Sequence, residues 1–347
     1  MKIRNGNEPT EITVPVEMLE FAIDPAHPEW WGYDDLIETW VELDKFPDMK
    51  MKNLPMYTEL DKVNRLHGII STPDELAKTC RRHRDMYFDI RDNGYDYSKP
   101  DTPIRVRIDD DGLIFVGNGH HRVSALLHLG VPEIKVTVKG RYKAWMNFKQ
   151  RLYDVYGKKY LYQPMDHPDF SDWSVNKMAC DEVLKFILDW VHVDGQLILD
   201  IGSCTGWFCY KLAEYGATMH GIDTDERKIE MAEYQRTYRE AYQDNPRFAY
   251  RSFQNHLHGT VHYDTVLLLN VLHHYLRKDV DKAMAMMKQI SEHSRQVVMQ
   301  LSTKIPITHE DFINRVLRET QYDGFTTYTP EDTPLRPVIL FSKGSII

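Results

Sequence analysis

The stretch LDIGSCTGWF, residues 199–208, decides the fold of the C-terminal half of the chain. The apolar run that leads into it predicts a buried strand at 196–202, and the residues after it predict a helix near 206–215. Gly202 and Gly206 allow a tight turn between the two elements, because neither residue has a Cβ. The start of the helix also offers free N–H groups. The stretch therefore predicts a ligand-binding turn between a strand and a helix.

The same alternation continues toward the C-terminus. Strands are predicted at 217–223, 247–251, 263–270 and 296–301, helices near 226–242, 279–292 and 309–319, and two further strand-like runs, FTTYT and PVILF, near the end. Strands that alternate with helices predict a parallel sheet whose ligand lies at the carboxyl ends of the strands. Asp223 ends the second strand about twenty residues after the glycine turn, where a carboxylate can bind both ribose hydroxyls of a nucleotide.

Residues 160–343 resemble class I S-adenosylmethionine-dependent methyltransferases. LDIGSCTGWFCYKLAEYGATMHGID (199–223) is similar to their first two motifs, and YDTVLLLNVLHHY (263–275) to their fourth-strand motif. YLYQPMDHPDFSDWSVNK (160–177) resembles the lead-in of members that act on small molecules and glycans. An NAD-dependent dehydrogenase shares the glycine and acid pattern but normally has a third glycine in a G-x-G-x-x-G motif, whereas the spacing here is Gly202-x-Cys204-x-Gly206. The resemblance therefore implies a Rossmann-like sheet that binds S-adenosylmethionine.

The resemblance also implies roles for individual residues. It places Asp200, Gly202, Ser203, Cys204 and Gly206 around the methionine side of the cofactor, Asp223 on the ribose and Asn270 near the sulfonium. Phe253 and Gln254 are the candidates for the adenine contact. His273 or His274 is the candidate base for an oxygen acceptor, and the alternative is that this pair only packs the helix after the fourth strand.

A second glycine turn, GNGHHRVSA at 117–125, lies in the N-terminal half. Strand-like runs at 104–108 and 113–117 flank Asp111 and Gly112 and predict a hairpin, followed by a helix at 122–129 and a strand at 134–138. The turn lets the backbone approach an anion, the helix start presents N–H groups, and Arg122 adds a bidentate donor for phosphate. A metal site is disfavoured, because adjacent histidines point in different directions and zinc ligands usually come from several segments.

Residues 11–140 resemble the ParB/sulfiredoxin-like superfamily, whose members bind nucleotide phosphates with a G-x-H-R or G-x-R-R box. The resemblance implies an α+β domain that binds ATP or CTP. It assigns the phosphates to Gly117, Gly119, His120, His121 and Arg122, with help from Ser124. His120 stands where sulfiredoxins have their catalytic cysteine, and the GHHR sequence is closest to a group that includes kinases of small hydroxy compounds. In such a kinase Glu17 or Glu20 would be the base. The insert 25–70 matches nothing recognised.

Composition and charge limit the partners and the cellular location that we expect for the chain. The 347 residues have a net charge of −9, which disfavours a nucleic-acid partner, although 135–159 is rich in lysine and arginine. The four cysteines form no CxxC pair, and no apolar run is long enough to span a membrane. We therefore expect a cytoplasmic protein with an N-terminal domain at 1–142, a connector and lead-in at 143–175, and a methyltransferase domain at 176–347.

The leading hypothesis is an S-adenosylmethionine-dependent methyltransferase that acts on a small polar molecule or a saccharide, with an N-terminal domain that binds a nucleotide. Three alternatives stay open. The N-terminal domain could phosphorylate a hydroxyl, which would make the chain a bifunctional kinase-methyltransferase. It could instead be a binding module without catalysis. The chain could also be a methyltransferase that modifies nucleic acid.

Overall fold

The computed structural model describes residues 8–21, 33–66, 68–97, 103–176, 180–238, 244–257, 261–302, 304–331 and 336–344. The chain forms two compact units. The N-terminal unit comprises 1–149 and 167–172, and the C-terminal unit comprises 150–166 and 173–347. The segment predicted as a connector, 143–175, therefore contributes to both units.

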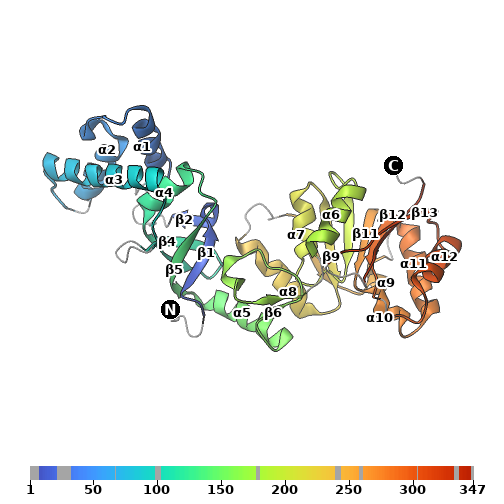
Figure 1. Cartoon of the computed structure of the whole chain (residues 1–347). Helices are drawn as coiled ribbons and strands as arrows, with labels where there is room; N and C mark the ends of the chain where they lie inside the picture. The colour runs from blue at the N-terminus through green and yellow to red at the C-terminus, as the bar shows by residue number, and fades with distance from the viewer. Residues whose placement is uncertain are drawn as a thin grey trace. The chain divides into compact units, whose positions relative to one another are not determined.

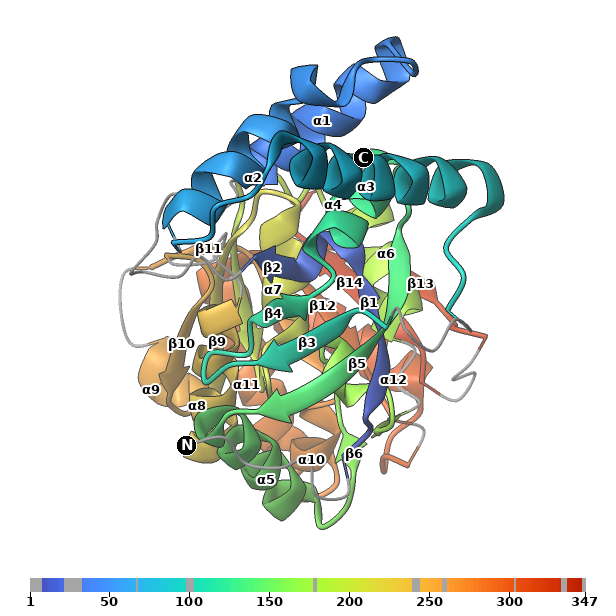
Figure 2. The ribbon, with the colours of Figure 1, turned by 90° about the vertical axis from the view of Figure 1, so that its left-hand side faces the viewer.

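The N-terminal unit contains a five-stranded mixed sheet in the order β1-β5-β3-β4-β2, whose strands lie side by side in Figure 2. The strands are β1 Glu11–Pro15, β2 Leu19–Phe21, β3 Arg105–Ile108, β4 Ile114–Asn118 and β5 Glu133–Arg141. β3 and β4 pair antiparallel, and the backbone amides of Asp111 and Leu113 donate to Oδ1 of Asp109 in the turn between them. The predicted hairpin is thus confirmed. Alternate residues of these strands are buried, so one face of the sheet forms a core.

Four helices accompany this sheet: α1 Tyr33–Lys45, α2 Pro55–Leu66, α3 Pro73–Asn93 and α4 His120–His128. α4 lies between the strands and the group formed by α1, α2 and α3 (Figures 1 and 2). α3 begins at Pro73, because Thr72 and Glu75 form a capping box and Pro73 occupies the first turn. The sequence did not predict α1 and α2, which lie in the insert 25–70. Short 3₁₀ helices are found at Val16–Met18 and Met51–Asn53.

A buried ionic network holds residues 167–172 in the N-terminal unit. Asp169, in the 3₁₀ helix Pro168–Phe170, is fully buried. It accepts hydrogen bonds from Arg141 at the end of β5, and from Trp145 and Lys149 on α5 Lys143–Tyr156. Burial raises the pKa of Asp169, but the bonds from Arg141 and the charge of Lys149 outweigh it and hold this pKa below its usual value. The carboxylate therefore stays ionised inside the unit.

The C-terminal unit contains a seven-stranded sheet in the order β10-β9-β8-β11-β12-β14-β13. The strands are β8 Leu197–Ile201, β9 Thr218–Asp223, β10 Arg247–Tyr250, β11 Tyr263–Leu269, β12 Ser294–Gln300, β13 Gly324–Tyr328 and β14 Val338–Ser342. β8 to β12 are parallel, and β14 runs antiparallel to both its neighbours. The order of the first five strands is that of the doubly wound nucleotide-binding fold, so the predicted Rossmann-like sheet is confirmed.

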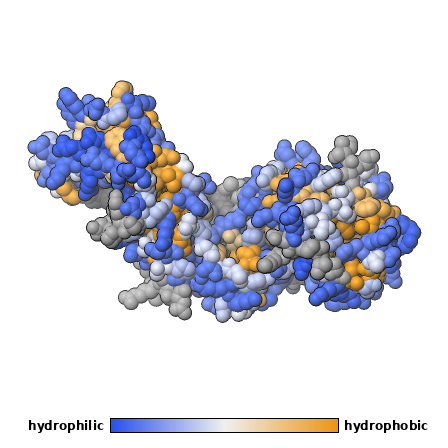
Figure 3. All heavy atoms as spheres, in the orientation of Figure 1, coloured by the Kyte–Doolittle hydropathy of each residue, from blue (hydrophilic) through white to orange (hydrophobic). Residues whose placement is uncertain are grey.

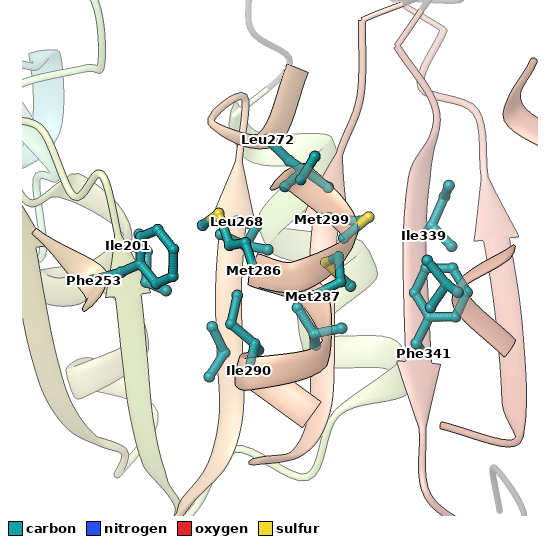
Figure 4. Packing of buried hydrophobic residues seen from close by; sticks show 14 of the residues in the cluster. Ile201, Phe253, Leu268, Leu272, Met286, Met287, Ile290, Met299, Ile339 and Phe341 are labelled. Carbon is teal, nitrogen blue, oxygen red and sulfur yellow. The ribbon is translucent and has the colours of Figure 1, made fainter. Parts of the chain in front are cut away.

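Helices cover both faces of this sheet (Figure 1). They are α6 Cys180–Trp190, α7 Trp207–Glu214, α8 Glu226–Tyr234, α9 Phe253–His256, α10 Leu272–Leu276, α11 Val280–His293 and α12 His309–Glu319. Apolar side chains of β11 alternate between two cores. Val266 and Leu268 pack with α10, α11 and α12, and part of this core is shown in Figure 4. Leu267 and Leu269 pack with α6 and α7. The strand is therefore buried on both faces, as a parallel sheet requires.

Some predicted boundaries of these elements were wrong. α4 begins at His120 and not at 122, because Gly119 adopts a left-handed conformation and ends the preceding strand segment. α8 ends at Tyr234 and continues as a 3₁₀ helix, Gln235–Tyr238; the rest of the helix predicted at 226–242 lies outside the described residues. α6 was not predicted. The short strands β6 Tyr160–Leu161 and β7 Ser174–Val175 form a separate parallel pair.

The surface agrees with the hydropathy of the sequence. Figure 3 shows mainly hydrophilic side chains on the visible face of each unit, with smaller apolar patches between them. Within the described part of the chain, no helix is both long enough and apolar enough to span a membrane.

Candidate functional site

The turn between β8 and α7 needs glycine at two positions. Gly202 and Gly206 have φ values of 79° and 84°. A Cβ on Gly202 would lie 2.5 Å from Cγ2 of Val271, and one on Gly206 would lie 2.5 Å from the ring of Phe248. The amides of Gly202 and Ser203 donate to the carbonyl of Ile222 and so fix the turn against β9. The sequence thus places glycine where neither the backbone angle nor the space permits a side chain.

Cys204 takes the middle position of the turn with a φ of 55°, a conformation that favours glycine. Its side chain is buried, and its Sγ lies 3.5 Å from the hydroxyl of Tyr156 on α5. Its backbone amide donates to Oδ2 of Asp223 at 3.1 Å. The side chain that replaces the usual glycine is therefore accommodated by a contact with α5, while the amide binds the carboxylate at the end of β9.

A cavity of about 560 Å³ lies at the carboxyl ends of β8, β9 and β11. Five of the predicted site residues line it: Gly202, Cys204, Asp223, Asn270 and His274. Its volume falls in the range of cavities that hold small molecules and cofactors. Oδ1 of Asp223 accepts from the amide of Asp225, and Nζ of Lys228 lies 4.0 Å from Oδ2. Both carboxylate oxygens are thus held in place at the edge of the cavity.

Asn270 directly follows β11 and adopts a φ of 60°. Its Nδ2 donates to Oε1 of Gln300 at 2.6 Å, and its Oδ1 accepts from Nη1 of Arg336 at 3.3 Å. Its amide N–H donates to the carbonyl of Gln300. A buried side chain with both polar atoms bonded has one fixed orientation, so Asn270 presents a defined surface to the cavity.

His273 and His274 occupy different environments, although their rings lie 4.1 Å apart. His274 is exposed and lines the cavity. His273 is buried, and its Nδ1 has no hydrogen-bond partner among the described residues. Burial, followed by the charges of His274, Arg277 and Arg336, lowers the pKa of His273 to about 4. The pKa of His274 is also lowered, first by burial. Both rings are therefore neutral near pH 7 and able to accept a proton.

The other predicted residues of this unit lie away from the cavity wall. Asp200 is buried beneath the turn, where burial raises its pKa to about 7 and the thiol of Cys209 donates to its Oδ2. Ser203 is buried, and Gly206 caps α7. Phe253 belongs to the core shown in Figure 4. Gln254 is partly exposed on α9. The structure thus does not bring Phe253 and Gln254 to the cavity.

Sequence reasoning missed several residues of the cavity. Tyr162, Thr224, Lys228, Val271, Tyr275, Lys278 and Lys282 also line it. Gln163 was missed as well, and its Oε1 accepts from the amide of Trp207 in the first turn of α7. Tyr162 and Gln163 belong to the segment 160–177 that resembles a methyltransferase lead-in. That resemblance was the available signal, but it did not identify individual positions.

A second cavity, of about 600 Å³, lies at the glycine turn of the N-terminal unit. Gly117, Gly119, His120, His121 and Arg122 line it together with Arg82, His83, Met86 and Asn118. Gly119 has a φ of 109°, and a Cβ there would lie 3.0 Å from Ile104 and 3.2 Å from the guanidinium of Arg122. Nη2 of Arg122 donates to Oδ1 of Asn118 at 3.0 Å. The predicted box is therefore gathered around one cavity, and α3 adds Arg82 and His83 to it.

The histidines of this cavity are packed against other rings. His121 stacks on His83 with centroids 3.8 Å apart and planes 7° from parallel. Burial, followed by the charges of Arg82 and Arg122, lowers the pKa of His83 to about 4, and burial also lowers the pKa of His121. The positive charge of the cavity at pH 7 therefore comes from its arginines. Of the predicted box, Ser124 is not in the cavity: it is buried and accepts a hydrogen bond from Trp40.

Residues 198–293 match a family model described as a methyltransferase domain. The match includes the glycine turn, Asp223, Asn270, His273 and His274. No curated protein matches the chain. Residues 198–293 therefore form a methyltransferase domain.

Solved structures resemble part of the chain. Magnesium protoporphyrin IX methyltransferase (ChlM) from Synechocystis PCC 6803, with bound SAM, is 20% identical over 56% of this chain and 90% of its own, with a TM-score of 0.42. WbdD, described in one structure as a bifunctional kinase-methyltransferase, is 18% identical over 57% of this chain, with a TM-score of 0.47. The matched part is 48% of the WbdD chain, less than two thirds of its length.

Proposed function

We propose that the C-terminal unit transfers the methyl group of S-adenosylmethionine to a small polar molecule or a saccharide. The observation that supports this most strongly is the cavity at the strand ends, where the glycine turn, Asp223 and Asn270 meet. The resemblance of 160–177 to lead-ins of enzymes acting on small molecules and glycans supports the acceptor class, as does the net charge of −9.

The residues present fit this donor. The carboxylate of Asp223 retains lone pairs for the ribose hydroxyls, and the glycine turn leaves room for the chain next to the sulfur. When bound, S-adenosylmethionine supplies a methyl group activated by a positively charged sulfur. Asn270 and the cavity wall hold the acceptor in line with that methyl group, which is catalysis by proximity. With a hydroxyl acceptor, the oxygen forms its bond to the methyl carbon as the carbon–sulfur bond breaks.

The hydroxyl proton must go to a base in the same cavity. His274 lines the cavity and is neutral near pH 7, so it is our first candidate, and the buried His273 beside it is the second. Incubation with methyl-labelled S-adenosylmethionine and a panel of sugars, sugar acids and small hydroxy compounds tests the proposal. Label recovered in one compound class, and lost with Asn270→Ala, is the expected result. Label in no member of the panel, from protein that binds the donor, contradicts the acceptor class.

We propose that the N-terminal unit binds the phosphates of a nucleotide at the turn 117–122. The cavity there, with Gly119 at the start of α4 and two arginines in its wall, supports this assignment. Thermal-shift titration with ATP and CTP is the test. One of them should raise the melting temperature, and the shift should vanish with Arg122→Gln but persist with Arg81→Gln, an exposed arginine of α3. Equal shifts in the two variants contradict the assignment.

A bifunctional kinase-methyltransferase is the second candidate, and one observation favours it. A further cavity of about 320 Å³ adjoins the phosphate turn and shares Gly117 and Asn118 with the first. Arg105, Arg107 and Lys139 line it, which suits the acceptor of a phosphoryl group. Transfer of labelled phosphate from ATP or CTP to an acceptor of the same panel supports the kinase. Nucleotide binding without such transfer favours a binding module.

The alternative of a nucleic-acid substrate gains no support from the basic stretch 135–159. Arg141 and Lys149 are buried and bound to Asp169. Lys135 pairs with Glu11, and Arg151 with Glu230. Much of the positive charge of this stretch is therefore already paired with carboxylates and is not available for a phosphate backbone.

A further inference from the structure

The strand order of the C-terminal sheet places Arg336 beyond Asn270, on the side away from Asp223. Asp223 ends β9, Asn270 follows β11, and β12 and β14 are the next two strands along the sheet. β14 runs antiparallel to β12, so its N-terminal end lies at the edge where the parallel strands have their carboxyl ends. Arg336 lies two residues before the start of β14 and therefore at the edge that holds the donor cavity.

The position of Arg336 is fixed by two hydrogen bonds. Its Nη1 donates to Oδ1 of Asn270 at 3.3 Å, and its carbonyl accepts from Nε2 of Gln300 at 3.3 Å. Arg336 is partly buried and forms no ion pair with a carboxylate among the described residues. A guanidinium has five N–H donors in a planar fork that suits an oxyanion. Among the described residues, the side chain of Arg336 therefore donates to Asn270, the residue that follows β11, and to no other side chain.

The charge of Arg336 acts on three neighbouring side chains, those of Tyr160, Tyr162 and His273. Burial raises the pKa values of Tyr160 and Tyr162, and the charge of Arg336 opposes this rise in both. Arg336 also contributes to the lowered pKa of His273, after burial and nearer charges. Tyr162 lines the cavity, so the charge of Arg336 acts on a residue of the cavity wall.

We propose that Arg336 binds an oxyanion of the methyl acceptor, a carboxylate or a phosphate. This inference rests on the proposed methyl transfer in the cavity. The acceptor must approach the methyl group from the side opposite the sulfur. With the ribose at Asp223 and the sulfur near Asn270, that side is the one where Arg336 lies. Arg336 therefore determines specificity: the acceptor is an acidic molecule, such as a sugar acid or a phosphorylated hydroxy compound.

The test uses anion probes on the full chain with S-adenosylhomocysteine bound. All proteins carry Arg122→Gln, so that the proposed phosphate site of the N-terminal unit does not contribute. Inorganic phosphate and acetate are titrated by calorimetry into this background, into Arg336→Gln and Arg336→Lys, and into Arg318→Gln, a control on the exposed surface of α12.

We expect at least one anion to bind the background and the control, with binding at least tenfold weaker in Arg336→Gln. Arg336→Lys keeps the positive charge but not the planar guanidinium, so its affinity for the anion should lie between those of the background and Arg336→Gln. Binding of inorganic phosphate indicates a phosphorylated acceptor, and binding of acetate indicates an acceptor with a carboxylate.

Two results would overturn the inference. One is that each anion binds the background protein and Arg336→Gln with the same affinity, or that neither anion binds either protein. The other is an affinity for S-adenosylmethionine that falls in Arg336→Gln while the affinity for 5′-methylthioadenosine, which lacks the amino-acid tail, does not change. Arg336 would then hold the carboxylate of the donor. A wild-type chain that does not bind S-adenosylmethionine at all is a different result, and it contradicts the proposed function itself.

Discussion

The backbone amide of Cys204 donates a hydrogen bond to Oδ2 of Asp223 across 3.1 Å. This bond joins the glycine turn after β8 to the carboxylate that ends β9. The two features predicted separately from the sequence are therefore parts of one cavity wall. A change in the turn should affect the ribose carboxylate, and the first prediction uses this dependence.

Cys204→Gly should bind S-adenosylmethionine about as well as the native chain, and Cys204→Val should bind it at least tenfold more weakly. Glycine adopts the φ of 55° without strain, whereas a β-branched side chain is a rare outlier there. The left-handed conformation costs a side-chain residue roughly 1–2 kcal/mol. Calorimetry with the donor measures both variants, and equal affinities would show that the turn conformation does not set the binding site.

The next prediction concerns the base. If one of the two histidines accepts the acceptor's proton, its replacement by alanine should lower kcat by a factor of roughly 10²–10⁴ without loss of donor binding. Burial lowers the pKa of His273 to about 4. If His273 is the base, the rate should therefore persist down to about pH 5 and fall below it. Near-native turnover by both His273→Ala and His274→Ala, with donor bound, would remove the base role.

His83 should make the protein less stable in mild acid. Burial, with the charges of Arg82 and Arg122, lowers its pKa to about 4 in the folded chain, whereas an unfolded histidine titrates near pH 6.5. Between these values the unfolded state binds more protons, so the free energy of unfolding decreases as pH falls from about 6.5 to 4.

His83→Gln should take up about one proton fewer than the native chain on unfolding near pH 5. Denaturant titrations from pH 4.5 to 7 measure this, with exposed His192→Gln as control. The same pH slope in both variants would contradict the environment described for His83.

Asp169→Asn should destabilise the N-terminal unit by about 3–5 kcal/mol, because it leaves the buried charges of Arg141 and Lys149 without their carboxylate. Asp172→Asn removes an exposed carboxylate of the same segment and should cost at most about 1 kcal/mol. Chemical denaturation measures both variants. A loss below about 1 kcal/mol in Asp169→Asn would mean that the network does not hold residues 167–172 in this unit.

The sequence was sufficient for the C-terminal sheet, because each strand is a short apolar run that ends at a turn. It was less informative for helices. α1 buries Leu36, Trp40 and Leu43, a helical spacing hidden by the aromatic and charged residues around it. α6 buries Cys180, Val183 and Ile187 in the same spacing, and this pattern is present in the sequence although the helix was not predicted. Local periodicity thus predicted most elements, but α1 and α6 were missed although both bury apolar residues at helical spacing.

The site was predicted where a single motif contains it, and missed where distant segments meet. Gly202, Cys204 and Asp223 lie within one strand-turn-helix-strand unit, so the spacing of the motif and its resemblance to methyltransferases placed them together. Arg336 contacts Asn270, and Gln163 contacts the first turn of α7, from segments far away in the sequence. Phe253 was expected at the adenine, but its side chain is buried in the core. Only the tertiary structure determines such placements.

The central claim is that the donor binds in the cavity where the glycine turn meets Asp223. Calorimetric titration of S-adenosylmethionine into the native chain, Asp223→Ala and Asp189→Ala tests it most directly, since Asp189 is an exposed carboxylate of α6 in the same unit. We predict binding to the native chain and to Asp189→Ala, and a loss of affinity of at least tenfold in Asp223→Ala, as expected when charged hydrogen bonds worth about 1.5–3 kcal/mol are removed. No binding to the native chain, or equal affinity in the two variants, would contradict the account.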